Sequence, residues 1–294
     1  MASSGITNIG SYQLMALIRA GHNCEIWDVQ SASDGVRWGM KLLPTGEKHT
    51  REQVAFLKHE YQVGRILDHE HVITTYEYGS GRLGSFIIME LFKHPNLKQQ
   101  MYSGAPRIAY LLETIVLEAA EGLSYLHKQG WIHCDIKPDN FLIDHEGHVR
   151  LIDFNLAVRR KSALARMFSS KPKIQGTKSY MSPEQIRGQT LDARSDIYGF
   201  GCMLYELAGG RMPFTGVNSN DLLNKHLKTK ALPLTVGNEN ITEPFAQLVA
   251  RMIAKKPADR PATMGEFLAE VSAIQIYRRR PEPPREDDVH EMDK

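Results

Sequence analysis

The stretch from Trp131 to Asn140 gathers side chains that could do chemistry. It holds a carboxylate at Asp135, an ammonium at Lys137 and an amide at Asn140. Pro138 stops any helix from running through it, because proline lacks a backbone N–H and clashes with the preceding turn. A helical pattern precedes the stretch and a hairpin pattern follows it, which predicts a rigid loop able to hold a site in fixed geometry.

Taken alone, this loop could be a structural turn with a buried aspartate and an asparagine cap. Further motifs accompany it in a fixed order: Lys41 at the end of a strand pattern, Glu60 on a helix pattern, Leu151-Ile-Asp-Phe-Asn155 and Tyr180-Met-Ser-Pro-Glu184. Together with His-x-Asp-x-Lys-x-x-Asn in the loop, this series resembles the motifs of the protein kinase family. The resemblance covers about residues 12–277.

The resemblance implies roles for the loop residues in phosphoryl transfer. Asp135 would orient the substrate hydroxyl and accept its proton, and Lys137 would steady the transferring phosphoryl group. Asn140 and Asp153 would hold Mg²⁺, a hard cation that prefers amide and carboxylate oxygens. Lys137, and Thr177 further on, resemble serine/threonine kinases and not tyrosine kinases.

An ATP site is also implied. Lys41 would hold the α- and β-phosphates and pair with Glu60, a carboxylate on an apolar helix face that would be costly to bury alone. The alternatives are a surface lysine and a solvated glutamate. The other nucleotide contacts implied are Ile18, Gly21, Ile26, Gly39, Met89, Glu90, Phe92 and Leu142.

Several positions of the nucleotide half depart from the family pattern. Arg19 and Cys24 replace two glycines of the phosphate-covering loop, where glycine lets backbone N–H groups approach phosphates, and only Gly21 matches. Gly39 replaces a small alanine, which predicts a slightly roomier base pocket. Gly64 costs about 1 kcal/mol of helix propensity and predicts a gap beside a loosely held helix.

Two departures concern the catalytic and metal-binding motifs. Cys134 replaces the arginine that pairs with a phosphorylated loop in regulated kinases, so loop phosphorylation is not predicted to be the main on-switch. Asn155 replaces a glycine, and asparagine is the non-glycine residue most able to adopt positive φ. We therefore expect Asn155 to preserve the backbone conformation of that glycine.

The segment between Leu156 and Pro183 is basic and contains no acidic residue. Its cationic side chains are Arg159, Arg160, Lys161, Arg166, Lys171, Lys173 and Lys178. A solvated loop is one interpretation, and a preference for acidic substrates or an acidic partner is the other. Nearby, Glu184 is expected to pair with Arg260 as a buried strut, and Asp196 to brace the loop backbone.

Composition limits the other classes. The chain has 294 residues, 42% hydrophobic content and a net charge of +2, which does not favour a nucleic-acid partner. Its three scattered cysteines fit a reducing compartment without a disulfide framework. A membrane-spanning helix needs about eighteen apolar residues, and no run in the sequence approaches this length. No secretion or myristoylation signal is visible. We expect a cytoplasmic protein, and the oligomeric state stays open.

The expected fold is α+β and two-lobed, with a small antiparallel β lobe carrying one helix and a larger, mainly helical lobe. The predicted bounds are 12–91 for the small lobe, 92–95 for the hinge, 96–277 for the large lobe and 278–294 for a disordered charged tail. The motifs look most like bacterial, eukaryotic-like serine/threonine kinases using ATP and Mg²⁺. The alternatives are a pseudokinase that serves as a binding module or scaffold and, less favoured, a small-molecule kinase.

Overall fold

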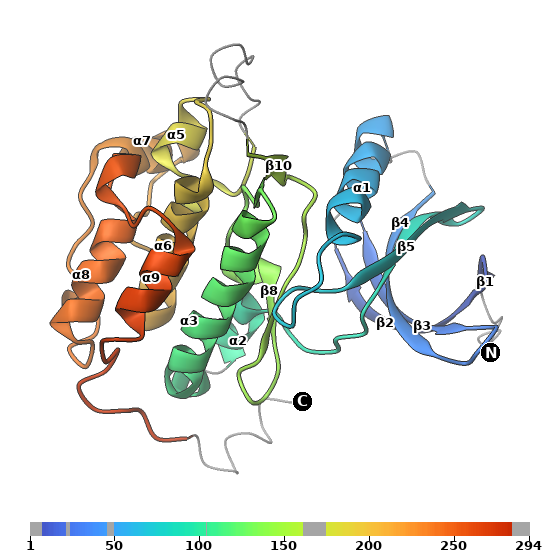
Figure 1. Cartoon of the computed structure of the whole chain (residues 1–294), viewed down its shortest axis with the longest axis horizontal. Helices are drawn as coiled ribbons and strands as arrows, with labels where there is room; N and C mark the ends of the chain where they lie inside the picture. Colours follow the sequence, from blue (N-terminus) through green and yellow to red (C-terminus); the bar gives the residue numbers. More distant parts are fainter. Residues whose placement is uncertain (1–7, 22–23, 46–49, 104, 161–174, 284–294) are drawn as a thin grey trace. The chain divides into compact units, whose positions relative to one another are not determined.

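The computed structural model describes residues 8–21, 24–45, 50–103, 105–160 and 175–283 (Figure 1). The chain forms two compact units. The N-terminal unit comprises Met1–His94 with Asp153–Asn155, and the C-terminal unit comprises Pro95–Ile152 with Leu156–Lys294. Within the described residues, no helix combines the length and the apolar character that a bilayer span requires. Four cations of the basic segment (Lys161, Arg166, Lys171, Lys173) and tail residues 284–294 lie outside the described residues.

The N-terminal unit is built on a six-stranded antiparallel sheet in the order β1-β2-β3-β4-β6-β5. The strands are β1 (Asn8–Ile9), β2 (Tyr12–Ala20), β3 (Glu25–Ser31), β4 (Arg37–Pro44), β5 (Thr75–Gly81) and β6 (Gly84–Met89). Alternate residues of the central strands, among them Val29, Met40 and Ile88, form a core beneath the sheet. The predicted antiparallel β lobe is therefore present.

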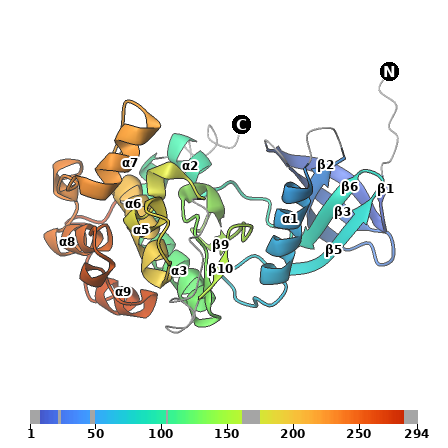
Figure 2. The ribbon, with the colours of Figure 1, turned by 90° about the horizontal axis from the view of Figure 1, so that it is seen from above.

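Helix α1 (Arg51–Gly64) lies beside this sheet (Figure 2). The predicted capping box begins it: the Thr50 hydroxyl accepts from the Gln53 amide, and the Gln53 side chain accepts from the Thr50 amide. Leu57 packs on the sheet residues Leu43 and Ile87. The same apolar face buries Glu60, so the helix carries a carboxylate into the interior of the unit.

The C-terminal unit is mainly helical. Its helices are α2 (Leu97–Ser103), α3 (Ala105–Lys128), α5 (Pro183–Ile186), α6 (Ala193–Gly209), α7 (Ser219–Lys228), α8 (Glu243–Met252) and α9 (Met264–Val271). Short strand pairs complete it: β7 (Trp131–Ile132) with β10 (Val158–Arg159), and β8 (Phe141–Ile143) with β9 (Val149–Leu151). Nearly every residue of α6 is buried, and α6 packs on both α3 and α8. The predicted α+β class is confirmed.

The first residues of the expected tail, Arg278 and Arg279, are bound to the C-terminal unit. The backbone N–H of Arg278 donates to Asn240 O at 2.7 Å, and that of Arg279 donates to Asn240 Oδ1 at 2.9 Å. Tyr277 forms a bridge with Ile241 just before them. The backbone carbonyl and the side chain of Asn240 each accept one of these N–H groups, which attaches the first tail residues to the C-terminal unit.

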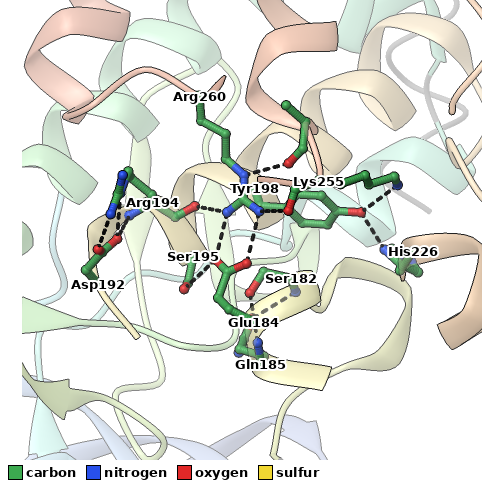
Figure 3. Close-up of polar contacts among 11 residues, drawn as sticks. Ser182, Glu184, Gln185, Asp192, Arg194, Ser195, Tyr198, His226, Lys255 and Arg260 are labelled. Atoms are coloured by element: carbon green, nitrogen blue, oxygen red, sulfur yellow. Dashed lines mark hydrogen bonds and ion pairs between the residues drawn. The ribbon is translucent and has the colours of Figure 1, made fainter. Parts of the chain in front are cut away.

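The predicted strut between Glu184 and Arg260 is present, and Figure 3 shows its contacts. Arg260 Nη1 donates to Glu184 Oε1 at 2.7 Å and Nη2 to Oε2 at 3.0 Å, a bidentate pair. Ser195 Oγ adds a bond to Glu184 Oε1 at 2.8 Å. The Arg260 guanidinium also lies 4.8 Å from the centre of the Tyr198 ring. Both charges are buried, so each depends on the other.

Replacing Arg260 by methionine should lower the free energy of unfolding by about 3 kcal/mol, because it leaves Glu184 buried without its cation. Arg251→Met is the matched control. Arg251 pairs with Glu270 at 2.7 Å, but both side chains are substantially exposed, so we expect a loss of about 0.5 kcal/mol. Urea unfolding measures both values, and equal losses would contradict the assignment of Glu184–Arg260 as the buried strut.

Candidate active site

The loop after β7 is held by one buried carboxylate. Asp196, in the first turn of α6, accepts the backbone N–H groups of His133 at 2.7 Å and Cys134 at 2.8 Å. His127 Nε2 lies 2.8 Å from the same carboxylate. Cys134 has φ of +69°, a left-handed conformation that a side chain disfavours and that needs outside support. The predicted brace by Asp196 is therefore confirmed and supplies that support.

Cys134 presents a neutral thiol. Its side chain is buried, and burial, followed by the charge of Asp196, raises its pKa well above the ordinary value. The backbone carbonyl of Cys134 accepts from Gln185 Nε2 at 2.7 Å, a contact that the motifs did not indicate. A cysteine side chain cannot supply the positive charge of the arginine that it replaces. Cys134 therefore cannot pair with a phosphate, which agrees with the predicted loss of the arginine's role.

The loop residues singled out by the sequence lie together. Lys137 Nζ is 2.7 Å from Asp135 Oδ2, and Asn140 Nδ2 donates to Asp135 O at 2.8 Å. Asn140 lies in the 3₁₀ turn η1 (Pro138–Asn140), and it is buried, as is Asp135. This bond fixes the side-chain nitrogen of Asn140, so the side-chain oxygen is the atom that could coordinate a cation. Amide oxygens are ligands that suit Mg²⁺.

Thr177 completes this cluster. Its backbone N–H donates to Asp135 Oδ1 at 2.7 Å, and its hydroxyl accepts from Lys137 Nζ at 2.9 Å. Gly176 precedes it with φ of +118°, and a Cβ there would lie 3.0 Å from Cys134 O. The Gly-Thr pair was the sequence signal for this contact, although it gave the residue class and not the partners.

In the N-terminal unit, the predicted Lys41–Glu60 ion pair forms. Lys41 Nζ lies 2.8 Å from Glu60 Oε1, 2.7 Å from Oε2 and 3.1 Å from Asp153 Oδ1. Burial alone would lower the pKa of Lys41, but the charges of Asp153 and Glu60 raise it above its ordinary value. Burial raises the pKa of Glu60, and the Lys41 ammonium opposes that rise. Lys41 is therefore a buried ammonium held by two acidic side chains.

The expectation for Asn155 is wrong. Among the described residues other than glycine, positive φ occurs at Cys134 and at Asp153, where it is +69°. The chain therefore makes its left-handed turn at Asp153, and Asn155 does not adopt the conformation expected of it. Its Oδ1 is buried, and no hydrogen-bond partner for it lies among the residues that the structure describes. The preference of asparagine for positive φ is a local one, and the left-handed residue is instead Asp153, whose carboxylate forms an ion pair with Lys41.

The implied nucleotide residues are distributed over both units. Ile18 lies on β2 and Ile26 on β3, opposite Lys41, and Gly21 closes the turn between these strands. Met89 ends β6, with Glu90 and Phe92 directly after it. Leu142 belongs to the C-terminal unit, where it pairs with Arg150 across β8 and β9.

Gly39 does not leave a roomier pocket. It pairs with Met89 across β4 and β6, and a Cβ at Gly39 would lie 2.9 Å from Glu90 O and 3.3 Å from Met89 Cγ. The Glu90 carbonyl therefore occupies the space that the methyl group of an alanine would need. The expectation is therefore wrong, because the missing methyl group permits a close approach of two strands.

Gly64 likewise leaves no gap. A Cβ there would lie 2.5 Å from Thr75 Oγ1 and 3.0 Å from Thr75 Cβ. Helix α1 thus packs directly on β5 at this point. The predicted loose helix is wrong in this respect, since Gly64 and Thr75 together let the end of α1 come close to the sheet.

One described member of the basic segment is bound to the fold. Arg159 Nη1 donates to Gln129 O at 2.8 Å, and the guanidinium lies 5.1 Å from the centre of the Trp131 ring. Its charge is therefore engaged locally. The preference for acidic partners stays a prediction.

Comparison with known proteins agrees with this geometry. Residues 12–271 match the protein kinase domain model, so the chain belongs to the protein kinase family. It is 30% identical over 277 residues to the serine/threonine-protein kinase PknA of Corynebacterium glutamicum, covering 92% of this chain and 58% of that one. The expected likeness to bacterial serine/threonine kinases, and the two-part kinase fold, are thereby confirmed.

Two further relatives carry the name PknB. The probable serine/threonine-protein kinase PknB of Bifidobacterium longum is 29% identical over 271 residues, which is 89% of this chain and 39% of that one. PknB of Mycobacterium leprae is 30% identical over 228 residues, covering 76% and 36%. The chain thus spans between 36% and 58% of the length of these three relatives.

The Gly64–Thr75 contact yields a test by double mutation. Gly64→Ala should destabilise the protein by about 1 kcal/mol, because the clash outweighs the gain of about 1 kcal/mol in helix propensity. In a Thr75→Ala background, which removes the closest atom, the same change should be neutral or stabilising. Thermal unfolding of the four proteins measures the sign. If Gly64→Ala alone stabilised the protein, the close contact with Thr75 would be contradicted, and the gap predicted from the sequence would be supported.

Proposed function

We propose that this protein is an enzyme that transfers the γ-phosphate of ATP to serine and threonine hydroxyls of protein substrates. The observation that carries the proposal is the shared ammonium of Lys41, bound by both oxygens of Glu60 and by Asp153. A buried cation fixed by two acids is suited to binding phosphate oxygens, because its position does not have to be organised when the nucleotide arrives.

Asp135 acts as the base in this proposal. Its carboxylate is oriented by Lys137 and by the Thr177 N–H. It accepts the proton of the substrate hydroxyl while the hydroxyl oxygen bonds to the γ-phosphorus, and the bond to the β-phosphate oxygen breaks to release ADP. Lys137 stabilises the charge on the transferring group. Lys137 and Thr177, the two residues whose resemblance to serine/threonine kinases favours these acceptors, are in contact.

Asn140 and Asp153 fit the proposed divalent cation by donor type, an amide oxygen and a carboxylate. When bound, Mg²⁺ neutralises charge on the phosphate oxygens. The nucleotide contacts proposed in addition are Ile18, Gly21, Ile26, Gly39, Met89, Glu90, Phe92 and Leu142. We assign residues 12–277 to the catalytic domain, with the lobe bounds expected from the sequence, and we retain a cytoplasmic location as part of the proposal.

A second candidate is a scaffold that has lost phosphoryl transfer. One contact favours it: the Gly21 N–H donates to Cys24 O at 2.8 Å, so an amide of the phosphate-covering turn is used within the turn. Burial also raises the pKa of the Cys24 thiol, which leaves it neutral. We rank this candidate second because the turn affects nucleotide affinity, whereas the charged residues of the reaction are all present.

Transfer of labelled γ-phosphate from ATP with Mg²⁺ separates the two candidates. The substrates are the protein itself, a generic acidic protein and a generic basic protein, and Asp135→Asn is the matched control. We expect label on serine or threonine that falls by a factor of about 100 or more in the variant, as for loss of a general base. Equal label in both, with cooperative melting of the native chain, would favour the scaffold. Greater transfer to the acidic substrate would support the role of the basic segment.

A further inference from the structure

A buried carboxylate of the N-terminal unit has no part in the proposed reaction. Asp28, on β3, has 0% of its surface exposed. Arg37 Nε donates to its Oδ1 at 2.7 Å, and Lys93 Nζ forms an ion pair with Oδ2. Burial alone would raise the pKa of Asp28, but the bonds from Arg37 and Lys93 hold it below the ordinary value. Asp28 is therefore an ionised group in the interior with two cationic partners.

The two cations come from different places. Arg37 begins β4, the strand next to β3, so its bond to Asp28 lies within the sheet. Lys93 follows the end of β6 at Met89 and belongs to the segment Glu90–Lys93, which overlaps the hinge expected at 92–95 and which we call the hinge segment. Both side chains are partly exposed, 40% for Arg37 and 51% for Lys93. Each reaches in from the surface to the same carboxylate.

The hinge segment is fixed at its start by backbone contacts. The Glu90 N–H donates to Thr74 O at 2.9 Å, and the Thr74 N–H donates to Glu90 Oε2 at 3.4 Å. Gly39 lets β4 approach the Glu90 carbonyl closely. The strand ladder ends at Met89, so Lys93 lies four residues beyond the last paired residue of β6.

The Asp28–Lys93 pair provides that second anchor. Asp28 is opposite Gly39 across β3 and β4, and Gly39 is opposite Met89 across β4 and β6, so one row of the sheet leads from Asp28 to the start of the hinge segment. The ion pair connects Lys93, at the end of the hinge segment, with Asp28, the first residue of that row. The backbone of Glu90 and Phe92 is thus held between two fixed points.

We propose that Asp28 is a positioning residue for the nucleotide base, acting through Lys93 to hold the hinge segment in the conformation that receives adenine. This inference rests on the proposed function, in which the backbones of Glu90 and Phe92 face the base. A segment ordered in advance lowers the free-energy cost of binding. It does so equally for bound substrate and transition state, so it changes KM for ATP and leaves kcat unaltered.

The pair of cations supplies a matched experiment. Lys93→Met removes the anchor but leaves Asp28 paired with Arg37, so the protein should fold. Arg37→Met removes a partner of the same carboxylate without releasing the hinge segment. We expect Lys93→Met to raise KM for ATP and Kd for ADP about fivefold, with kcat unchanged. Arg37→Met should leave KM and Kd near the native values, and Lys93→Arg should restore them.

The outcomes separate this inference from the proposed function. Native KM and Kd in Lys93→Met, or an equal rise in Arg37→Met, would overturn the positioning role while phosphate transfer stands. If the native chain transfers no phosphate but binds ADP, and Lys93→Met weakens that binding as expected, the positioning role stands and the proposed activity falls. Native protein that binds neither ATP nor ADP, measured by calorimetry, would overturn both.

Discussion

The ammonium of Lys41 is the interaction on which the N-terminal unit depends. Its two carboxylate partners come from α1 and from the turn at Asp153, which is distant in sequence. A glutamate in the interior is costly without a cation, so Glu60 fixes the face that α1 turns toward the sheet. The close approach at Gly64, which a larger residue would prevent, lets the end of the helix lie against β5. The position of α1 is therefore specified by charge and by a small residue together.

Buried carboxylates serve the same purpose elsewhere in the chain. Asp196 accepts two backbone N–H groups and keeps a left-handed residue in place, and Glu184 holds Arg260 in a bidentate pair. Asp28 joins two strands to the segment after β6. In each case an acid with little exposure binds groups that lie apart in sequence. Removing one partner leaves an uncompensated charge, so these contacts specify geometry strongly even where their net stabilisation is modest.

The sequence was sufficient for contacts that charge demands. Lys41 and Glu60 could be paired in advance because the resemblance to the kinase motifs implies both residues, and a carboxylate on an apolar helix face is costly to bury without a cation. The sequence was insufficient at two glycines. Gly39 and Gly64 suggested empty space, but a glycine does not indicate which neighbour packs against it. The Glu90 carbonyl fills the space at Gly39, and the Thr75 side chain fills it at Gly64. The prediction of positive φ at Asn155 was wrong because the conformational preference of one residue does not determine where the chain makes its left-handed turn. Asp28 was overlooked because a single acid in a strand resembles an exposed alternate position.

The role of the Lys41–Glu60 pair is tested by kcat/KM for ATP in Glu60→Gln, measured well below the melting temperature of the variant. The glutamine keeps the size of the side chain but removes the charge that, with Asp153, fixes Lys41. If the ion pair positions the phosphates, kcat/KM should fall by about 100-fold, as expected for a displaced catalytic group. An unchanged kcat/KM in a folded variant would show that the pair supports the fold and does not position the phosphates.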